Sequence, residues 1–175
     1  SEWLIGVVEN LLSITRLNDG RLKFKFTDQL LDEVIAESLR HISRKHDDYK
    51  IVTDCEELVL ARMDVRLIMQ VLVNLIDNAI KYSADKPIII NVNTGYENEK
   101  PFFTVADKGI GMEQENINHI FDRFYRADQS RNKEIDGNGL GLSIAKWIIE
   151  QHNGHIDVVS EIGKGSCFKI TFPKL

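Results

Sequence analysis

The sequence has few cysteines and lacks any long apolar run. Its two cysteines, Cys55 and Cys167, lie far apart and without C-x-x-C spacing. This pattern argues against a disulfide framework or a cysteine-rich zinc site, so we expect two reduced, buried thiols. No apolar run approaches the about 18 residues that span a bilayer, and no charged stretch leads into an apolar one as in a signal peptide. We therefore expect a soluble segment without a secretion signal.

Positive charge is also in deficit. The 175 residues include 22 Lys and Arg against 27 Asp and Glu, which gives a net charge of −5. Because nucleic-acid binding depends on neutralising many phosphates, we expect no nucleic-acid partner. A nucleotide pocket stays open, since it needs only a few local cations. The length suits one globular domain with a short appendage, and the hydrophobic fraction of 43% is that of ordinary soluble proteins.

Apolar periodicity and turn residues predict a mixed α+β domain behind an N-terminal helix. Residues 2–17 repeat apolar side chains at spacings of three and four, which fits either an amphipathic helix docked on its own domain or a helix cut from a larger bundle. Alternation predicts a strand over residues 23–26, and Thr27 is expected to cap the next helix. Further strands are expected at residues 50–53, 58–61, 87–94, 101–106, 155–160 and 166–172, and helices at residues 64–82, 113–121 and 140–151. This order favours a mixed, mainly antiparallel sheet with helices on one face, and residues 128–138 are a candidate mobile loop.

The helix expected at residues 64–82 has an unusual polar side. Its apolar side holds Val65, Ile68, Leu72, Leu75, Ile76 and Ala79, and its polar side holds Gln70, Asn74, Asp77, Asn78 and Lys81. Asn is a poor helix former, so Asn74 and Asn78 one turn apart require a reason. An Asn oxygen can ligate Mg²⁺, and the Lys81 ammonium can meet a phosphate. The alternative is a solvated face with two incidental Asn.

Residues 107–111 (Asp-Lys-Gly-Ile-Gly) follow an expected strand. Asp107 has the parity of Phe103 and Val105, so its carboxylate should point toward the apolar side of the sheet. A buried carboxylate is costly without a partner, and an exocyclic amine such as that of adenine would supply one. Gly109 and Gly111 permit tight turning and close backbone approach. The alternative is a simple turn.

Three further segments are weak signals on their own. Residues 137–141 (Gly-Asn-Gly-Leu-Gly) lead into a helix whose first N–H groups attract an anion. They match neither the dinucleotide fingerprint nor the P-loop, and the HRD and DFG kinase signatures are absent. Arg123 and Arg126 stand among aromatic residues and could offer charge to a γ-phosphate, although an aromatic anchor with surface Arg fits as well. Residues 163–166 form a Gly turn that alone indicates only a hairpin.

In their order and spacing these segments together resemble the sequence boxes of sensor histidine kinases. Residues 74–83 are similar to the N-box, 107–111 to the G1 box, 121–124 to the F-box, 137–141 to the G2 box and 163–166 to the G3 turn. The resemblance implies the ATP-binding superfamily that also holds the gyrase, Hsp90 and MutL ATPase domains. It implies their α+β two-layer sandwich, the Bergerat fold: a mixed, mainly antiparallel sheet of about five strands packed on three helices, here with an N-terminal helical appendage.

The same resemblance implies roles for single residues. Asn78 would ligate the Mg²⁺ that bridges the ATP phosphates. Asn74 would line that site, where hydrolytic relatives carry a Glu; since Asn cannot act as a general base, phosphoryl transfer is favoured over rapid hydrolysis. Asp107 would accept a hydrogen bond from the adenine amine, and Tyr82 would pack by the adenine or ribose. The expected catalytic residues are Asn74, Lys81 and Arg123, and further nucleotide contacts are expected from Gly109, Gly111, Arg126, Gly137, Gly139, Leu140, Gly141 and Ser166, with residues 127–138 as the ATP lid.

The phosphoacceptor expected for this family is missing from the sequence. No pattern like HELRTPL occurs, and His41, His46, His119, His152 and His155 are read as ordinary surface or partly buried histidines. Residues 1–20 would then be the end of a dimerisation helix with its linker, and residues 21–175 the catalytic domain. Residues 10–17 are similar to potassium-responsive sensor kinases of the Kdp type.

The resemblance also implies the setting of the whole protein. We expect a homodimeric, membrane-anchored bacterial sensor kinase, of which this part is cytoplasmic, that passes a phosphoryl group to a response regulator. One alternative is a stand-alone ATPase of the same superfamily. The other is a non-catalytic interaction module with a vestigial nucleotide pocket.

Overall fold

The computed structural model describes residues 12, 23–42, 49–83, 87–123, 125 and 141–175. The helix expected at residues 2–17 lies outside this part of the chain except for Leu12, which is helical. The loop expected at residues 128–138 also lies outside it. The boundary between residues 20 and 21 therefore stays a prediction.

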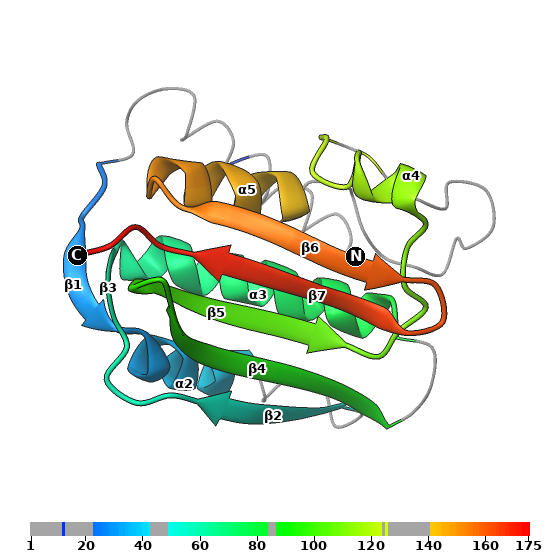
Figure 1. Ribbon diagram of the computed structural model, residues 1–175, viewed down its shortest axis with the longest axis horizontal. Helices are drawn as coiled ribbons and strands as arrows, with labels where there is room; N and C mark the ends of the chain where they lie inside the picture. The colour runs from blue at the N-terminus through cyan, green and yellow to red at the C-terminus, as the bar shows by residue number, and fades with distance from the viewer. Residues whose placement is uncertain (1–11, 13–22, 43–48, 84–86, 124, 126–140) are drawn as a thin grey trace.

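A five-stranded sheet organises the described residues (Figure 1). Its spatial order is β2-β4-β5-β7-β6. The strands span Tyr49–Cys55 (β2), Ile88–Glu97 (β4), Lys100–Asp107 (β5), His155–Glu161 (β6) and Gly165–Thr171 (β7). Only the β2–β4 pair within this sheet is parallel; the other three pairs are antiparallel. The expectation of a mixed, mainly antiparallel sheet is confirmed.

Three helices cover one face of the sheet and make the second layer (Figure 1). They are α2 (Leu31–Ile42), α3 (Val65–Lys81) and α5 (Gly141–Gln151), and a short α4 (Gln114–Ile117) follows β5. The apolar side of α3 is buried, as its 3.6-residue period predicts. Across from it, β5 and β7 point Phe103, Phe168 and Ile170 inward. Each such buried side chain stabilises the fold by roughly 1.5–3 kcal/mol.

The start of the domain differs from the expectation. Residues 23–26 form no strand, although the alternation is real: Phe24 and Phe26 are half-buried while Lys23 and Lys25 are exposed. Thr27 does not cap a helix but opens β1 (Thr27–Leu30), which pairs with β3 (Leu60–Met63) in a separate two-stranded sheet. This pairing joins segments about thirty residues apart, so local periodicity carries no signal for it.

Two other boundaries were wrong. The strand expected at residues 58–61 begins two residues later, since Leu58 takes a left-handed turn conformation with φ 61°. The helix expected at residues 113–121 shortens to the four residues of α4. Both cysteines are free, as expected, but half-buried rather than buried.

Candidate nucleotide-binding site

Asp107 ends β5 with its carboxylate turned inward, as the strand parity predicts. Its side chain is buried, and Oδ1 accepts hydrogen bonds from the backbone N–H groups of Gly109 at 2.8 Å and Ser166 at 3.3 Å. Burial raises the pKa of this carboxyl, and the two hydrogen bonds oppose that rise in part. Both hydrogen bonds use Oδ1, so Oδ2 is the oxygen that a ligand donor would meet.

The loop after Asp107 is pressed against the end of α3. A Cβ on Gly109 would lie 2.2 Å from the carbonyl oxygen of Tyr82, a distance no side chain tolerates. The next N–H, that of Ile110, donates to the same oxygen at 3.0 Å. The loop thus holds Asp107, the residue expected to bind adenine, beside the C-terminal end of α3. The same helix carries Asn74, Asn78 and Lys81.

The turn between β6 and β7 closes this corner from the other side. Gly165 has φ +97°, and a Cβ there would lie 2.1 Å from the carbonyl oxygen of Asp107. The Ser160 hydroxyl accepts from the Met112 N–H at 2.8 Å and lies 2.7 Å from the Ser166 hydroxyl. Two loops distant in sequence therefore form one hydrogen-bonded unit, which we call the Asp107 corner: Asp107 to Met112 with Ser160 to Ser166.

Ser166, an expected nucleotide contact, lies in this corner, and Ser160 was not identified from the sequence. Ser160 belongs to an ordinary strand in sequence, and only the register of β6 against β7 brings it to the corner. Gly111, also predicted, has φ +71°, and its Cβ would lie 2.0 Å from the carbonyl oxygen of Glu161.

Asn74 connects α3 to α5. Its Nδ2 donates to the Gly141 carbonyl at 3.0 Å, and its Oδ1 accepts from Gln70 Nε2 at 2.8 Å. Both ends of the amide are thus in use within the protein. One turn further along α3, Asn78 is half-buried and Lys81 is exposed. The predicted polar side of the helix and the predicted Gly141 are therefore brought together.

The predicted F-box behaves mainly as an anchor. Phe121 packs edge-on against the core residue Phe168 with ring centroids 6.4 Å apart, and the Lys146 ammonium lies 5.5 Å above the Phe121 ring. The Tyr125 hydroxyl donates to Asn116 Oδ1 at 2.7 Å. Arg123 is exposed. Four other predicted residues lie outside the described part of the chain: Arg126, Gly137, Gly139 and Leu140.

The oxygen donors fit Mg²⁺ better than any softer metal. Within the described ranges, no three His, Cys, Asp or Glu side chains gather as a metal cluster. Asn78 offers an amide oxygen, and Mg²⁺ takes oxygen ligands from few protein groups plus phosphates and water. A magnesium ion held chiefly by the nucleotide suits this arrangement.

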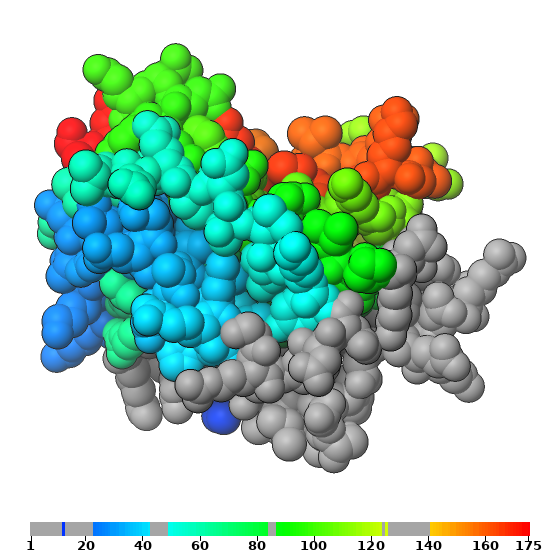
Figure 2. All heavy atoms as spheres, turned by 90° about the horizontal axis from the view of Figure 1, so that it is seen from below, coloured from blue at the N-terminus to red at the C-terminus, as the bar shows by residue number. Residues whose placement is uncertain are grey.

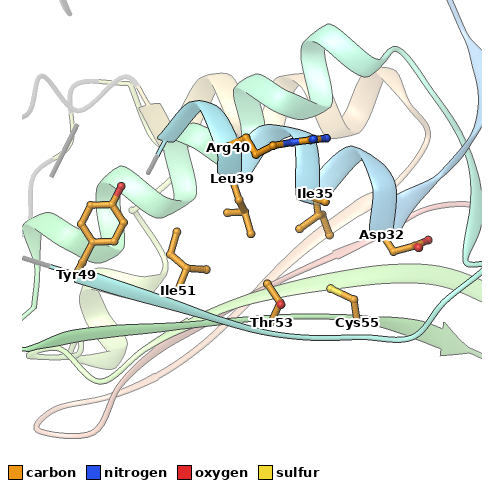
Figure 3. Close-up of a pocket in the computed structure, with 9 residues that line it drawn as sticks. Asp32, Ile35, Leu39, Arg40, Tyr49, Ile51, Thr53 and Cys55 are labelled. Atoms are coloured by element: carbon orange, nitrogen blue, oxygen red, sulfur yellow. The ribbon is translucent and has the colours of Figure 1, made fainter. Parts of the chain in front are cut away.

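A hollow lies at the sheet edge, between α2 and β2. Figure 2 views the molecule from this edge, and Figure 3 shows the residues that line it. Its volume is about 470 Å³, and Ile35 and Leu39 of α2 face Tyr49 and Ile51 of β2 across it. None of the predicted site residues lines this hollow, so it is separate from the Asp107 corner.

The two-layer sandwich is that of an ATPase-type nucleotide-binding domain. The chain belongs to the family described as histidine kinase-, DNA gyrase B- and HSP90-like ATPase, whose sequence profile matches residues 63–175. No helix in the part of the chain that the structure describes is long and apolar enough to cross a membrane.

The relatives are sensor kinases. The chain is 37% identical to the sensor protein KdpD of Clostridium acetobutylicum over 99% of its own length and 19% of that protein's. It is 38% identical to the histidine-protein kinase ArlS of Staphylococcus aureus (strain USA300), over 97% of the chain and 38% of that protein. The chain thus spans only a minor part of these relatives.

Solved histidine kinase structures share the fold. The catalytic domain of ThkA is 27% identical, with a TM-score of 0.72 over 86% of this chain and 98% of that one. The mycobacterial kinase MprB is 23% identical, with a TM-score of 0.73 over 85% of this chain and 97% of that one. The expected fold class is confirmed by both likenesses.

Proposed function

We propose that this chain is the catalytic part of a sensor histidine kinase, which binds Mg-ATP and delivers its γ-phosphoryl group to a His of a dimerisation domain. The observation that carries the proposal is the buried carboxylate of Asp107 in a corner built from backbone. Burying a carboxylate is costly, and the N–H groups of Gly109 and Ser166 bind only Oδ1, which leaves Oδ2 for a further donor. An adenine amine is the partner that this family's chemistry supplies.

The base of the nucleotide would sit on the Asp107 corner. Oδ2 of Asp107 would accept from the exocyclic amine while Oδ1 stays held by Gly109 and Ser166. Gly109 and Gly111 lack the Cβ atoms that would strike the carbonyl oxygens of Tyr82 and Glu161, so the loop beside the base can pack tightly on the rest of the corner. Tyr82, at the end of α3, would pack beside the adenine or ribose.

The phosphates would lie along the polar side of α3. Asn78 would supply one oxygen ligand to Mg²⁺, and the ion would neutralise phosphate charge. Lys81 would meet a phosphate, and Arg123 or Arg126 would orient the γ-phosphate. Gly137, Gly139, Leu140 and Gly141 would bring N–H groups at the start of α5 toward the same anion.

An Asn at position 74 favours transfer of the phosphoryl group over hydrolysis of ATP. An amide cannot take a proton from water, and this one is already bonded to Gly141 and Gln70. A ring nitrogen of the acceptor His on the dimerisation domain would bond to the γ-phosphorus. The bond from that phosphorus to the oxygen bridging the β- and γ-phosphates would break, leaving ADP. The stand-alone ATPase alternative lacks the acid it needs at this position.

The remaining partners follow from the relatives. One solved structure of the same fold is described as ThkA in complex with the response regulator TrrA. We infer that the whole protein likewise hands its phosphoryl group to a response-regulator Asp, as a homodimeric and membrane-anchored sensor kinase. KdpD and ArlS are equally similar, so the potassium-responsive type is no better supported than another sensor kinase.

Calorimetric titration of the chain with ATP tests the proposal. We expect saturable one-to-one binding that Mg²⁺ strengthens, and a melting temperature that rises because the ligand binds only the folded state. After incubation with labelled ATP the chain itself should carry no phosphohistidine. Absence of any binding heat and thermal shift, or phosphohistidine on this chain, would contradict the proposal.

A further inference from the structure

The segment of residues 23–26 is docked on α5 instead of being paired in a sheet. The Phe24 and Phe26 rings stack with centroids 5.5 Å apart, and Phe24 also stacks on Trp147 at 6.0 Å. Phe26 meets the His152 ring edge to face at 5.1 Å. In Figure 1 this segment, drawn in blue just before β1, runs beside the C-terminal end of α5. Aromatic side chains therefore form a dedicated contact, which we call the aromatic clasp: Phe24, Phe26, Trp147 and His152.

Asp64, the N-cap residue of α3, supplies the polar half of this contact. An N-cap Asp ordinarily uses its carboxylate on N–H groups of its own helix, but Asp64 makes no such bond. Its Oδ2 accepts from the Lys25 backbone N–H at 3.0 Å, and Arg66 lies 3.3 Å from the same oxygen. Only 1% of Asp64 is exposed. The N-cap carboxylate of α3 thus holds the segment through the Lys25 N–H.

His152 joins the end of α5 to the start of α3. Its Nδ1 lies 2.7 Å from the Ile148 carbonyl, which can only accept, so Nδ1 carries the proton. Its Nε2 then accepts from the Asp64 N–H at 3.0 Å. Burial lowers the pKa of His152, which keeps the ring neutral and the bond intact. His152, which is expected from the sequence to be an ordinary histidine, is therefore a buried side chain that connects α5 to α3.

The same two helices are joined again at the nucleotide end. There, Asn74 of α3 donates to the carbonyl of Gly141, the first residue of α5. The helices therefore run antiparallel, with Asp64 paired to His152 at one end and Asn74 to Gly141 at the other. At 1.5 Å per residue the two junctions are roughly 15 Å apart. Since helices are stiff over this length, a shift of α5 at one junction reaches the other.

We propose that docking of residues 23–26 on Trp147, His152 and Asp64 regulates nucleotide binding by holding α5 in register with Asn74. This inference rests on the proposed function and adds a way in which nucleotide affinity at that site is regulated. The segment continues upstream into the residues that resemble a dimerisation helix, so movement there would pull on Phe24 and Lys25 directly. Undocking frees α5 to slide along α3 and weakens the site; by linkage, bound nucleotide strengthens docking by the same factor.

Two variants of the 175-residue chain test this coupling through affinity for Mg-ATP. Phe24→Ala removes one half-buried ring, and Lys25→Pro removes the N–H that Asp64 binds together with an exposed Lys side chain. Phe102→Ala is the matched control, because Phe102 is a half-buried ring on the open face of the sheet, beneath the Lys169 ammonium. We expect both test variants to bind Mg-ATP about fivefold or more weakly, and the control to bind as the wild type does. Wild-type affinity in both folded test variants would overturn the proposal.

A second readout needs no nucleotide. The side-chain amide resonance of Asn74 reports its bond to Gly141, far from the substituted residues. We expect it to shift in Phe24→Ala and Lys25→Pro and to stay in place in Phe102→Ala. If the wild type binds no nucleotide, the proposed function fails, and an unchanged Asn74 resonance in Lys25→Pro would then overturn the coupling separately.

Discussion

The two ends of the candidate site are built in different ways. The Asp107 corner is made largely of backbone, with a carboxylate held by two N–H groups and glycines whose Cβ atoms would strike carbonyl oxygens. The phosphate end consists of side chains, with Asn78 half-buried and Lys81 and Arg123 exposed. Folding itself therefore shapes the corner, whereas the proposed phosphate end would gain its order from the ligand. Changes of the corner glycines, whose Cβ positions are blocked by backbone, should cost stability, whereas changes at the proposed phosphate end should cost binding alone.

The largest expected effect comes from Gly165→Ala. The substitution adds the cost of a left-handed conformation, about 1–2 kcal/mol, to overpacking of about 1–3 kcal/mol against the Asp107 carbonyl. Gly163→Ala is the matched control, since Gly163 also has a positive φ of +79° but nothing lies within 4 Å of its Cβ position. Urea denaturation should show a clearly larger loss for Gly165→Ala. Equal losses would mean that the corner is not tightly built.

Asn78→Ala should act on the other end without harming the fold. Removing a ligand oxygen of Mg²⁺ should weaken ATP binding about tenfold or more when Mg²⁺ is present, the scale of one lost hydrogen bond to a charged group. Without Mg²⁺ the affinity should match the wild type. Asn93→Ala, at an exposed position of β4, serves as the control. If Mg²⁺ still raises the ATP affinity of Asn78→Ala as much as that of the wild type, Asn78 is not a ligand of the metal.

Smaller effects are expected for Lys81→Gln and Arg123→Gln. Both side chains are exposed, so each should contribute only about 0.2–1 kcal/mol to binding, and salt should screen that contribution. Titrations at low and high ionic strength would measure it, with Lys50→Gln on β2 as the control. A loss that stays the same in high salt would show that the ligand buries these charges.

The smallest effect concerns the pH dependence of stability. Burial raises the pKa of Asp107 above its unfolded value, so the folded state binds the proton more readily. The contribution of Asp107 to stability is then fully present below the unfolded pKa and is lost as pH rises through the folded pKa. Asp107→Asn should accordingly be as stable as the wild type or more stable at neutral pH. A large loss of stability at neutral pH would show that the fold itself needs the charge.

Local sequence patterns predicted what depends on neighbouring residues. The two-residue period of β5 placed Asp107 inward, and the 3.6-residue period of α3 separated its buried side from Asn74 and Asn78. The motif order pointed to the family, which the matching profile confirms. The assigned roles of single site residues stay predictions.

Features that depend on distant contacts were not predictable. The pairing of β1 with β3, the use of the Asp64 carboxylate by Lys25, and the bond from Asp64 to His152 each join residues thirty or more positions apart. The alternation of residues 23–26 was real, but its cause was a stack on Trp147 and not a sheet. Alternating apolar side chains predict that one side of a segment is buried, but they do not identify the element that covers that side.

The central claim is that the Asp107 carboxylate receives the adenine amine, and calorimetric titration of Asp107→Asn with Mg-ATP tests it most directly. The Asn keeps an oxygen for Gly109 and Ser166, but its NH₂ would replace Oδ2 and face the amine donor to donor. We predict an affinity lower by about tenfold or more, with stability retained, while Asp157→Asn on the exposed side of β6 binds as the wild type does. Superimposable titration curves for Asp107→Asn and Asp157→Asn would contradict the account.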